Sequence, residues 1–467
     1  MAEKTIRIAG TQGFYGDSPM GAIAVAMERG ADYLMHDALA ELTLSILQKD
    51  KLKDPTQGFA KDILLHAKML YPLALAKGMK IVSNSGGLNP ESAAQQVQAI
   101  LEKSGIKGVK IATITGDNFA DKLGELESAG LKLENMDDGT PYFPAKYPVT
   151  HANVYIGAQS VKDALDQGAQ IILAGRVADP CLALGIIAHE FNWEIKQAST
   201  PEELNRLASG IVIGHILECG GQASGGNSYA EWPMPYSISN LGYPIAEVKE
   251  DGSAIITKLQ SQGGKVSRNT VREQLVYEIH DPSNYITPDV VVDLTQIEVK
   301  DIGENQVSVK NVKGKPRPEK LKLAIGQMEG YITEQFMFFS WPYAYDKLKM
   351  FQKATQEIWS KLPVQLDETR FNIIGVNGIH EGAAPEISAD KLNEMNEIGL
   401  RIVIKHKDKM AGRIAMGSIV CLGLNGPPGV ISVPGWGKTN RAMLSLWPTL
   451  IPREFVQPEV KITTTGV

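Results

Sequence analysis

The stretch that decides the fold of this sequence is TIRIAGTQGFYGDSPMGAIAVAMERGADYLM, residues 5–35. It begins with a short apolar run at Thr5–Ala9, continues with apolar residues at helical spacing over Pro19–Arg29, and ends in a second apolar run at Asp32–Met35. Short apolar runs that alternate with helical patterns are typical of a parallel sheet wrapped by helices. Residues 5–35 therefore predict the first two strands of such a sheet and the helix between them.

The same alternation continues along the first half of the chain. Further short apolar runs stand at Met79–Ser83, Val109–Thr113 and Gln170–Ala174. The predicted helices around them cover Leu39–Gln48, Ala60–Ala76, Pro90–Lys103 and Ser160–Gln167. We therefore predict an α/β fold with an N-terminal, mostly parallel sheet that carries helices on both faces.

The sequence pattern changes at Trp232–Pro235, where prolines interrupt the alternation of apolar runs and helical patterns. The runs Ile245–Val248 and Ala254–Lys258 flank Glu-Asp-Gly, which predicts a hairpin. Later strands and helices are predicted at Lys322–Ile325, Ala344–Leu362, Asn372–Val376, Leu400–Lys405 and Lys409–Leu424. The sequence thus predicts an α/β ligand-binding domain over residues 1–235 and a smaller α/β or α+β domain over residues 236–467.

Size, charge and cysteine content narrow the class of protein. At 467 residues the chain exceeds the size at which one hydrophobic core usually stops growing. Its 47 basic and 53 acidic residues give a net charge of −6, which offers no general attraction for nucleic acid or an anionic membrane. Three dispersed cysteines indicate a reducing compartment, and neither a signal peptide nor a membrane span is recognisable. We expect a cytoplasmic protein whose partners are small molecules or proteins.

Ligands of open α/β sheets bind in the loops beyond the carboxyl ends of the strands. The first such loop, Gly10–Pro19, has glycines at intervals of three, which matches neither the dinucleotide fingerprint nor a P-loop. The loop after the third strand leads into a helix with Asn89 as its predicted cap and Pro90 in its first turn, so that free amides would suit an anion. The predicted substrate contacts in these loops and after the fourth strand are Gly13, Gly16, Asp17, Asn84, Ser85, Gly86, Gly87, Asn89 and Asp117.

Charged side chains follow the second and fifth strands. Asp37 and Glu41 stand one helical turn apart and could do acid/base work, although a helix cap and a structural ion pair explain them as well. Arg176 is the predicted clamp for a substrate carboxylate or phosphate, because its planar fork binds two oxygens. The alternative for Arg176 is an ion pair with Asp179 or Asp117. Asp179 is also predicted to contact the substrate.

The segment HILECGGQASGGN, residues 215–227, concentrates an acid, a base, a thiol and amides beside four glycines. A helix that ends near Gly220 would carry the imidazole, the carboxylate and the thiol on one face. The alternative is a core-facing histidine and cysteine followed by a glycine turn. The predicted catalytic residues of this segment are His215, Glu218 and Cys219, and the predicted substrate contacts are Gln222 and Asn227.

Seven ordered segments resemble those of one protein family. They are the glycine loop through Gly16 and Asp17, Asp37–Thr43, Asn84–Pro90, Gly175–Pro180, residues 215–227, Gly242–Glu247, and Glu273–Glu278 with the loop to Asp289. On these segments the chain is identified as a member of the acyclic terpene utilisation (AtuA-type) family. The family is named for operons that degrade citronellol- and geraniol-type branched acids as CoA thioesters. Members often have a small ferredoxin-like domain after this region or as a separate protein, so the resemblance implies a companion subunit and a homo- or hetero-oligomer.

The leading prediction is a lyase of the hydratase/dehydratase type, acting on a small hydroxy or unsaturated carboxylic acid or its CoA thioester. No nicotinamide, ATP, thiamine or iron–sulfur motif is found, so no cofactor is expected. Such a reaction needs a base for the proton α to the carbonyl, an acid for the leaving hydroxyl and a positive clamp for the enolate-like charge. The predicted base is His215 or Glu218, the acid is Asp37 or Glu41, and the clamp is Arg176 with the amides of residues 86 and 87.

Three alternatives stay open at this point. A divalent cation, Mg²⁺, Mn²⁺ or Zn²⁺, could be bound by Asp37, Glu41, His215 and Glu218, which would give a metal-dependent hydrolase or lyase. The chain could instead be a non-catalytic subunit of an acyl-CoA-processing complex. A covalent route through Cys219 would need a histidine–carboxylate support that the sequence does not assign.

Overall fold

The computed structural model describes residues 4–143, 147–432 and 439–466. These residues form two compact units, each with its own sheet and hydrophobic core. The first unit comprises the described residues within 1–143, 149–326 and 446–467, and the second comprises those within 144–148 and 327–445. None of the described helices is long and apolar enough to cross a membrane.

The first unit is built on a ten-stranded sheet whose five central strands are parallel. In sheet order the central strands are β1 (Thr5–Gln12), β2 (Tyr33–His36), β3 (Lys80–Ser83), β6 (Ile171–Ala174) and β4 (Lys110–Thr115). Strands β2 and β6 are buried at every position, as expected for parallel strands covered on both faces. Each central strand coincides with one of the predicted apolar runs, so the predicted parallel sheet is confirmed.

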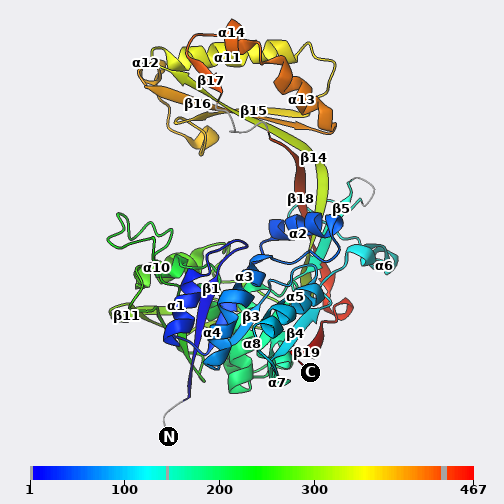
Figure 1. Ribbon diagram of the computed structural model, residues 1–467, viewed down its shortest axis with the longest axis vertical. Coiled ribbons are helices and arrows are strands. Elements are labelled where there is room, and N and C mark those ends of the chain that lie inside the picture. The colour runs from blue at the N-terminus through cyan, green and yellow to red at the C-terminus, as the bar shows by residue number, and fades with distance from the viewer. Residues whose placement is uncertain (1–3, 144–146, 433–438, 467) are drawn as a thin grey trace. The chain divides into compact units, whose positions relative to one another are not determined.

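Helices cover both faces of this sheet (Figure 1). One apolar cluster joins the sheet to α1 (Met20–Glu28), α3 (Asp62–Met69), α4 (Tyr71–Ala76) and α5 (Pro90–Lys103). A second cluster joins it to α7 (Gln159–Asp166), α8 (Asp179–Phe191) and α9 (Pro201–Leu217). Neighbouring residues of β1 point to opposite faces, since Ile8 belongs to the second cluster and Ala9 to the first. The predicted α/β architecture is therefore confirmed.

Local sequence signals position the two helices that carry most of the site. Helix α9 begins with a capping box, in which the Thr200 hydroxyl accepts from the Glu203 amide at 3.3 Å and the Glu203 carboxylate accepts from the Thr200 amide at 2.9 Å. Gly214, near the end of α9, passes so close to α8 that an added Cβ would lie 2.3 Å from the Pro180 carbonyl oxygen. This close crossing brings the start of α8 beside the end of α9.

Antiparallel strands complete both edges of the large sheet. They are β7 (Ile245–Lys249), β8 (Ala254–Thr257), β12 (Gln306–Lys310) and β11 (Glu298–Gly303) beyond β1, and β19 (Glu459–Thr464) beyond β4. The predicted hairpin is confirmed as β7 and β8, and β7 pairs with the edge of β1 that would otherwise lack hydrogen-bond partners. Strands after residue 236 thus belong to the first unit, and the predicted boundary between residues 235 and 236 does not coincide with a division between the units.

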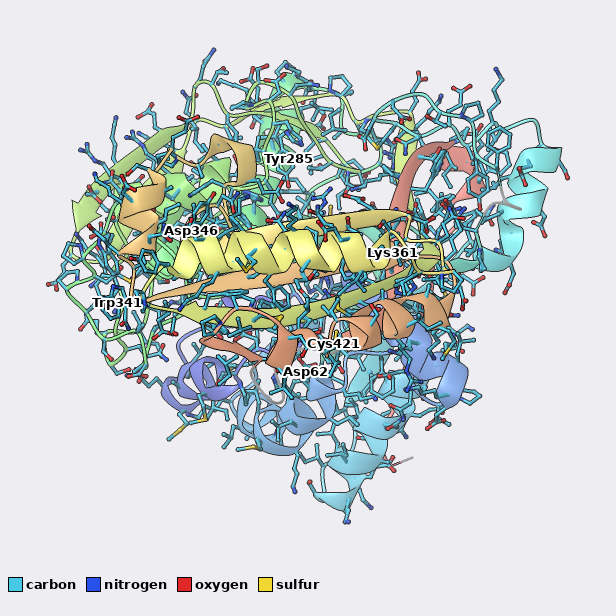
Figure 2. All side chains as sticks on the ribbon, turned by 90° about the horizontal axis from the view of Figure 1, so that it is seen from above. Asp62, Tyr285, Trp341, Asp346, Lys361 and Cys421 are labelled. Carbon is cyan, nitrogen blue, oxygen red and sulfur yellow. The ribbon has the colours of Figure 1, made fainter. Side chains whose placement is uncertain are left out.

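The second unit has an antiparallel sheet in the order β15, β16, β14, β17, with bounds Glu368–Ile374, Glu397–His406, Lys320–Ser340 and Val430–Ser432. Helix α11 (Ala344–Trp359) packs on this sheet through Leu348 and Phe351. Figure 2 shows α11 lying along the sheet, with Asp346 near its start and Lys361 just beyond its end. This unit is the smaller α+β part of the fold.

Two long strands belong to both units. Strand β14 begins at Lys320 in the first unit and ends at Ser340 in the second, and β18 (Thr439–Pro452) runs from the second unit back to the first. The two strands pair with each other. The predicted strand Lys322–Ile325 is therefore only the beginning of β14. The second unit is made of two segments, within residues 144–148 and 327–445, that are both inserted in the chain of the first unit.

Candidate active site

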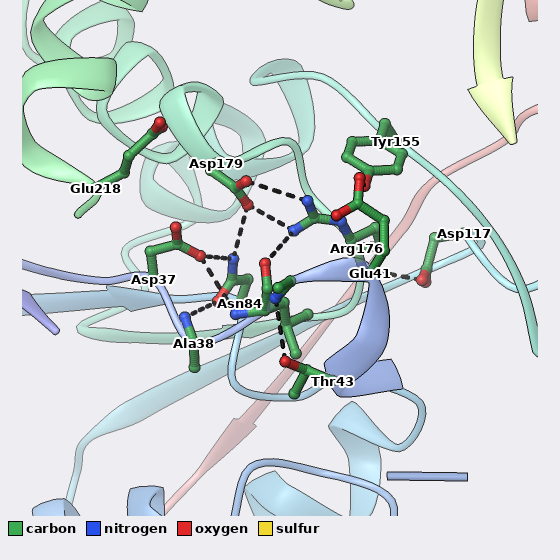
Figure 3. Close-up of polar contacts among 12 residues, drawn as sticks. Asp37, Ala38, Glu41, Thr43, Asn84, Asp117, Tyr155, Arg176, Asp179 and Glu218 are labelled. Carbon is green, nitrogen blue, oxygen red and sulfur yellow. Dashed lines mark hydrogen bonds and ion pairs between the residues drawn. The ribbon is translucent and has the colours of Figure 1, made fainter. Parts of the chain in front are cut away.

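Polar side chains from several loops meet at the carboxyl ends of the central strands. Asp37 follows β2, Asn84 follows β3, and Asp179 begins α8 after β6. The Asn84 amide nitrogen donates to Asp37 Oδ1 at 2.6 Å and to Asp179 Oδ1 at 3.4 Å, while its oxygen accepts from the Ala38 amide at 2.7 Å. Figure 3 shows Asp179 between Asn84 and Arg176. The predicted convergence of these loops at one edge of the sheet is therefore present.

Arg176 lies at the centre of this group and is 1% exposed. Its two terminal nitrogens donate to the Asp179 carboxylate at 2.5 and 3.1 Å, and one of them also donates to the Leu39 carbonyl at 3.0 Å. Its guanidinium carbon lies 4.1 Å from the centre of the Tyr155 ring. The ion pair with Asp179 that the sequence left open is thus formed, and it holds the guanidinium in a fixed orientation.

Asp117 supports Arg176 from behind. Its Oδ2 accepts from the backbone amide of Arg176 at 2.9 Å and from the Asn153 side chain at 2.7 Å, and it is buried. In this position Asp117 fixes the turn after β6 and does not line the cavity described next.

A cavity of about 590 Å³ in the first unit adjoins Arg176. Its charged and titratable lining residues are Glu41, Arg176, Asp179, His215, Glu218, Glu278, Glu319, Lys320 and Lys322. Its other lining residues are mostly apolar or aromatic and include Met136, Tyr155, Pro180, Tyr285, Ile286, Pro288, Leu321 and Leu450. The cavity therefore combines acid/base groups with a wall suited to hydrocarbon.

His215 and Glu218 form a buried pair at the end of α9. The Nδ1 atom of His215 lies 2.8 Å from Glu218 Oε1, and the two side chains are 3% and 6% exposed. Gln274 fixes the helix end by donating to the His215 carbonyl at 2.7 Å, and the Tyr285 ring packs against the imidazole with centroids 5.4 Å apart. Among the described residues, neither His215 Nε2 nor Glu218 Oε2 has a hydrogen-bond partner. Both residues line the cavity.

The two partners change each other's proton affinity. Burial raises the pKa of Glu218 to about 7, although the neighbouring His215 opposes that change. Burial by itself lowers the pKa of His215, but the Glu218 carboxylate outweighs it, so the pKa of His215 is raised. The pair can therefore hold or exchange a proton near neutral pH.

The pKa values of Asp37 and Glu41, the two predicted acids, are shifted in opposite directions. Burial, followed by the charges of Asp179 and Glu218, raises the pKa of Asp37. Burial also acts to raise the pKa of Glu41, but the Tyr155 hydroxyl and Lys322, whose Nζ lies 3.1 Å from Glu41 Oε1, lower it to about 2. Glu41 lines the cavity as an anion, whereas Asp37 is not among the residues that line it.

The predicted contacts of the first glycine loop instead build the loop itself. Asp17 accepts from the Gly13 amide at 2.9 Å and from the Tyr243 hydroxyl at 2.7 Å. The Gly16 amide donates to Asp62 at 2.7 Å. Gly13 also touches the turn after α9, because an added Cβ would lie 2.3 Å from the backbone nitrogen of residue 220. None of these residues lines the cavity. Gly13 serves close packing, whereas Gly16 has a φ of 95°, which favours glycine.

The turn after β3 differs in detail from its prediction. Pro90 opens α5 and Asn89 takes the cap position, as predicted, but the Asn89 side chain makes no cap bond and donates instead to the carbonyls of residues 55 and 57 at 3.0 and 2.8 Å. The Ser85 hydroxyl bonds to Ser83 at 2.6 Å. The Gly87 amide donates to the Asn84 carbonyl at 3.1 Å, and an added Cβ at Gly86 would lie 2.6 Å from the Ala174 carbonyl. This turn is packed against the protein and does not line the cavity.

The remaining residues of the 215–227 segment lie beside the cavity wall. Gln222 donates to the Gln274 side chain at 2.8 Å, and the exposed Asn227 donates to Gln222 at 3.4 Å. Cys219 is partly exposed, and burial followed by the charge of Glu218 raises its pKa, which keeps the thiol protonated. These three residues do not line the cavity.

Tyr155 and Lys322 are cavity residues that the sequence did not single out. Lys322 lies 4.8 Å from the centre of the Tyr155 ring, on which Arg176 also packs, and the Tyr155 hydroxyl donates to Glu41. Lys322 sits near the start of β14, and Tyr155 follows β5 (Val149–Val154), which pairs with β14. Their only sequence signal is a charged and an aromatic residue beside apolar runs.

The arrangement of the possible ligand side chains bears on metal binding. Within residues 4–143, 147–432 and 439–466, no three histidine, cysteine, aspartate or glutamate side chains are arranged to hold a metal ion. Asp37, Glu41, His215 and Glu218 thus do not form a ready cation site in this structure.

One of three comparisons with known proteins finds a match, and this match covers nearly the whole chain. No curated protein and no solved structure matches it. The sequence profile of one family, described as acyclic terpene utilisation family protein AtuA, matches residues 6–462. The match spans both compact units and every loop of the site, and the chain belongs to this acyclic terpene utilisation family.

Proposed function

We propose that the chain acts in acyclic terpene utilisation as a lyase of the hydratase/dehydratase type, on a small hydroxy or unsaturated carboxylic acid or its CoA thioester. One observation carries the proposal. A single cavity is lined by the buried His215–Glu218 pair and by two cations, Arg176 and Lys322, that pack on the Tyr155 ring. His215 Nε2 and Glu218 Oε2 have no hydrogen-bond partner among the described residues.

The pair supplies the base and the acid of the proposed reaction. Glu218, with a pKa near 7, can take the proton α to the carbonyl, and a protonated His215 can give its proton to the leaving hydroxyl. Of the two acids considered from the sequence, Glu41 is ionised and Asp37 stands outside the cavity. We therefore assign the acid role to His215.

Arg176 and Lys322 are the proposed clamp for the enolate-like charge. Both cations lie on the same aromatic ring, and the contacts with Asp179 and Glu41 hold them in place before a substrate arrives. Preorganised charge of this kind stabilises a developing anion without reorganisation at the moment of reaction. The Gly87 amide, part of the clamp first considered, already donates within its own turn.

The apolar part of the wall supports a branched acyl substrate. Met136, Ile286, Leu321 and Leu450 come from separate elements and line the same cavity of about 590 Å³. That volume lies within the range of small-molecule sites, roughly 300–1,000 Å³.

The test is turnover by purified protein on a panel of α,β-unsaturated branched acids and their CoA thioesters, followed by loss of the conjugated absorbance. We expect Glu218→Gln and His215→Asn to lower kcat by about 10²- to 10⁴-fold while substrate binding is retained. Glu202→Gln, which changes an exposed glutamate in the first turn of the same helix, is the matched control and should leave kcat unchanged.

Two outcomes would contradict the proposal. Binding of a thioester without turnover by the unmodified protein would favour the non-catalytic subunit. Turnover that disappears in chelator and returns with Mg²⁺, Mn²⁺ or Zn²⁺ would favour the metal-dependent enzyme.

A further inference from the structure

A second cavity, of about 380 Å³, lies in the first unit beside the candidate active site. Its walls come from the start of α7 and the loop before it, from the loop between α8 and α9, from the loop that holds Asp289, from the start of β14 and the chain before it, and from the chain between β18 and β19. Its lining residues include Gln159, Ser160, Lys196, Asp289, Arg317 and Arg453. Three of these side chains are cations and one is a carboxylate.

The cations of this cavity are short of carboxylate partners. Within the described ranges, neither Lys196 nor Arg317 has an ion-pair partner within 4 Å, although Arg317 is partly buried. Arg453 donates to the carbonyls of Pro288 and Pro318, which fix its orientation, and Asp289 is the carboxylate of the cavity that attracts its charge. Burial, and then repulsion from Arg317, lower the pKa of Arg453. Positive charge thus gathers in a cavity of a protein whose net charge is −6.

The one carboxylate of the cavity is already engaged. Asp289 is 4% exposed, and its Oδ2 accepts from the Ala158 amide at 2.7 Å and from the Cys181 thiol at 3.4 Å. It anchors the start of α7, so it offsets one charge of the cluster and leaves the other two uncompensated.

This cavity shares a wall with the candidate active site. Leu321 lines both cavities. Pro288 lines the active cavity and its neighbour Asp289 the basic one, while Pro318 and Arg317 are divided in the same way. The two cavities therefore adjoin each other at Leu321.

The cavity of the candidate active site has more acidic than basic side chains in its lining. Its lining holds five carboxylate side chains, Glu41, Asp179, Glu218, Glu278 and Glu319, against the three cations Arg176, Lys320 and Lys322. A ligand with a neutral acyl part and a strongly anionic part would match the two cavities separately, since like charges in one site repel.

We propose that the basic cavity, lined by Lys196, Arg317 and Arg453, binds a phosphoryl or pyrophosphoryl group. Guanidinium groups bind such oxygens in pairs, and the cluster carries the surplus charge that a dianion needs. The group belongs either to the substrate of the proposed lyase, as the phosphate end of a CoA thioester, or to a separate phosphorylated ligand. The first case rests on the proposed function, whereas the second does not.

Direct binding is the first test, with pyrophosphate as the probe in calorimetry of the full chain at constant ionic strength. We expect saturable binding that Arg317→Gln and Lys196→Gln each weaken by about tenfold. Arg206→Gln, at an exposed ion pair with Glu202, is the matched control and should not change it. Pyrophosphate that does not bind saturably, or that binds equally well to Arg317→Gln and the unmodified protein, would overturn the proposal.

Kinetics then separate the two sources of the group. If the phosphate belongs to the substrate, Arg317→Gln raises KM for the CoA thioester about tenfold and leaves kcat and the KM of the free acid unchanged. If it belongs to a separate ligand, the KM values stay unchanged while pyrophosphate binding is still weakened. Glu218→Gln keeps pyrophosphate binding in either case, so failure of the lyase proposal can be told from failure of this one.

Discussion

Glu218 and Glu41 are two glutamates on the wall of one cavity, yet their proton affinities move in opposite directions. Burial raises the pKa of Glu218 to about 7, and the adjacent His215 only partly opposes the change. Burial also disfavours the charge of Glu41, but a tyrosine hydroxyl and a lysine lower its pKa to about 2. The comparison teaches that neighbours, and not depth alone, divide these carboxylates into a proton carrier and a fixed anion.

The largest effect is expected from replacing Arg176, the buried cation that pairs with Asp179. Arg176→Met leaves Asp179 without its charged partner, so the unfolding free energy should fall by about 3–5 kcal/mol. Urea unfolding at neutral pH measures the loss. Arg206→Met, which breaks an exposed pair, should cost no more than about 1 kcal/mol. Equal losses in the two variants would show that the Arg176 pair contributes no more than a surface contact.

Glu218 should make stability fall as pH rises. Its folded pKa of about 7 exceeds its usual value of 4.5, so between these pH values the folded state binds more protons than the unfolded state. The unfolding free energy of the unmodified protein, relative to Glu218→Gln, should fall across that window by up to about 3 kcal/mol. Denaturation measured at several pH values tests this slope, and a rising difference would contradict the assigned shift.

Glu41 should show the opposite slope in a more acidic window. Its folded pKa of about 2 lies below 4.5, so its stabilisation is complete above pH 4.5 and is lost as pH falls toward 2. With a third of the side chain exposed, we expect only about 1–2 kcal/mol relative to Glu41→Gln. Tyr155→Phe removes the hydroxyl that donates to Glu41 and should shrink the same slope. An unchanged slope in Tyr155→Phe would show that the cations Lys322 and Arg176 hold the anion without the hydroxyl.

The smallest effect is expected at Cys219. Its thiol is protonated and does not line the cavity, so Cys219→Ser should keep kcat within about twofold of that of the unmodified protein. Slow labelling by iodoacetamide at neutral pH would report the same protonated state. Loss of turnover in this variant would revive the covalent route.

The parallel half of the fold could be predicted because its signals are local. Each central strand is a short apolar run, and each crossover helix has its own apolar face. The long strands β14 and β18 could not be predicted in the same way, because their pairing joins residues far apart in the chain and depends on tertiary contacts. Strand β19 pairs with β4 for the same non-local reason.

The site was predictable in its charged residues more than in its glycines. Arg176, His215, Glu218 and Glu41 line one cavity, as their positions after the strands and at the end of α9 suggested. The glycine loops have the composition of ligand-binding turns, but close packing of backbone on backbone requires glycine equally. Lys322 could not be predicted as a site residue, because the sequence around it does not indicate that the start of β14 lines this cavity.

The insertion of residues 327–445, the main part of the second unit, has a consequence for protein engineering. This segment joins the first unit at two junctions, near residues 326 and 446, and the strands β14 and β18 that cross these junctions pair with each other. A tight turn could therefore replace the whole segment between them, or a foreign module could be grafted in its stead.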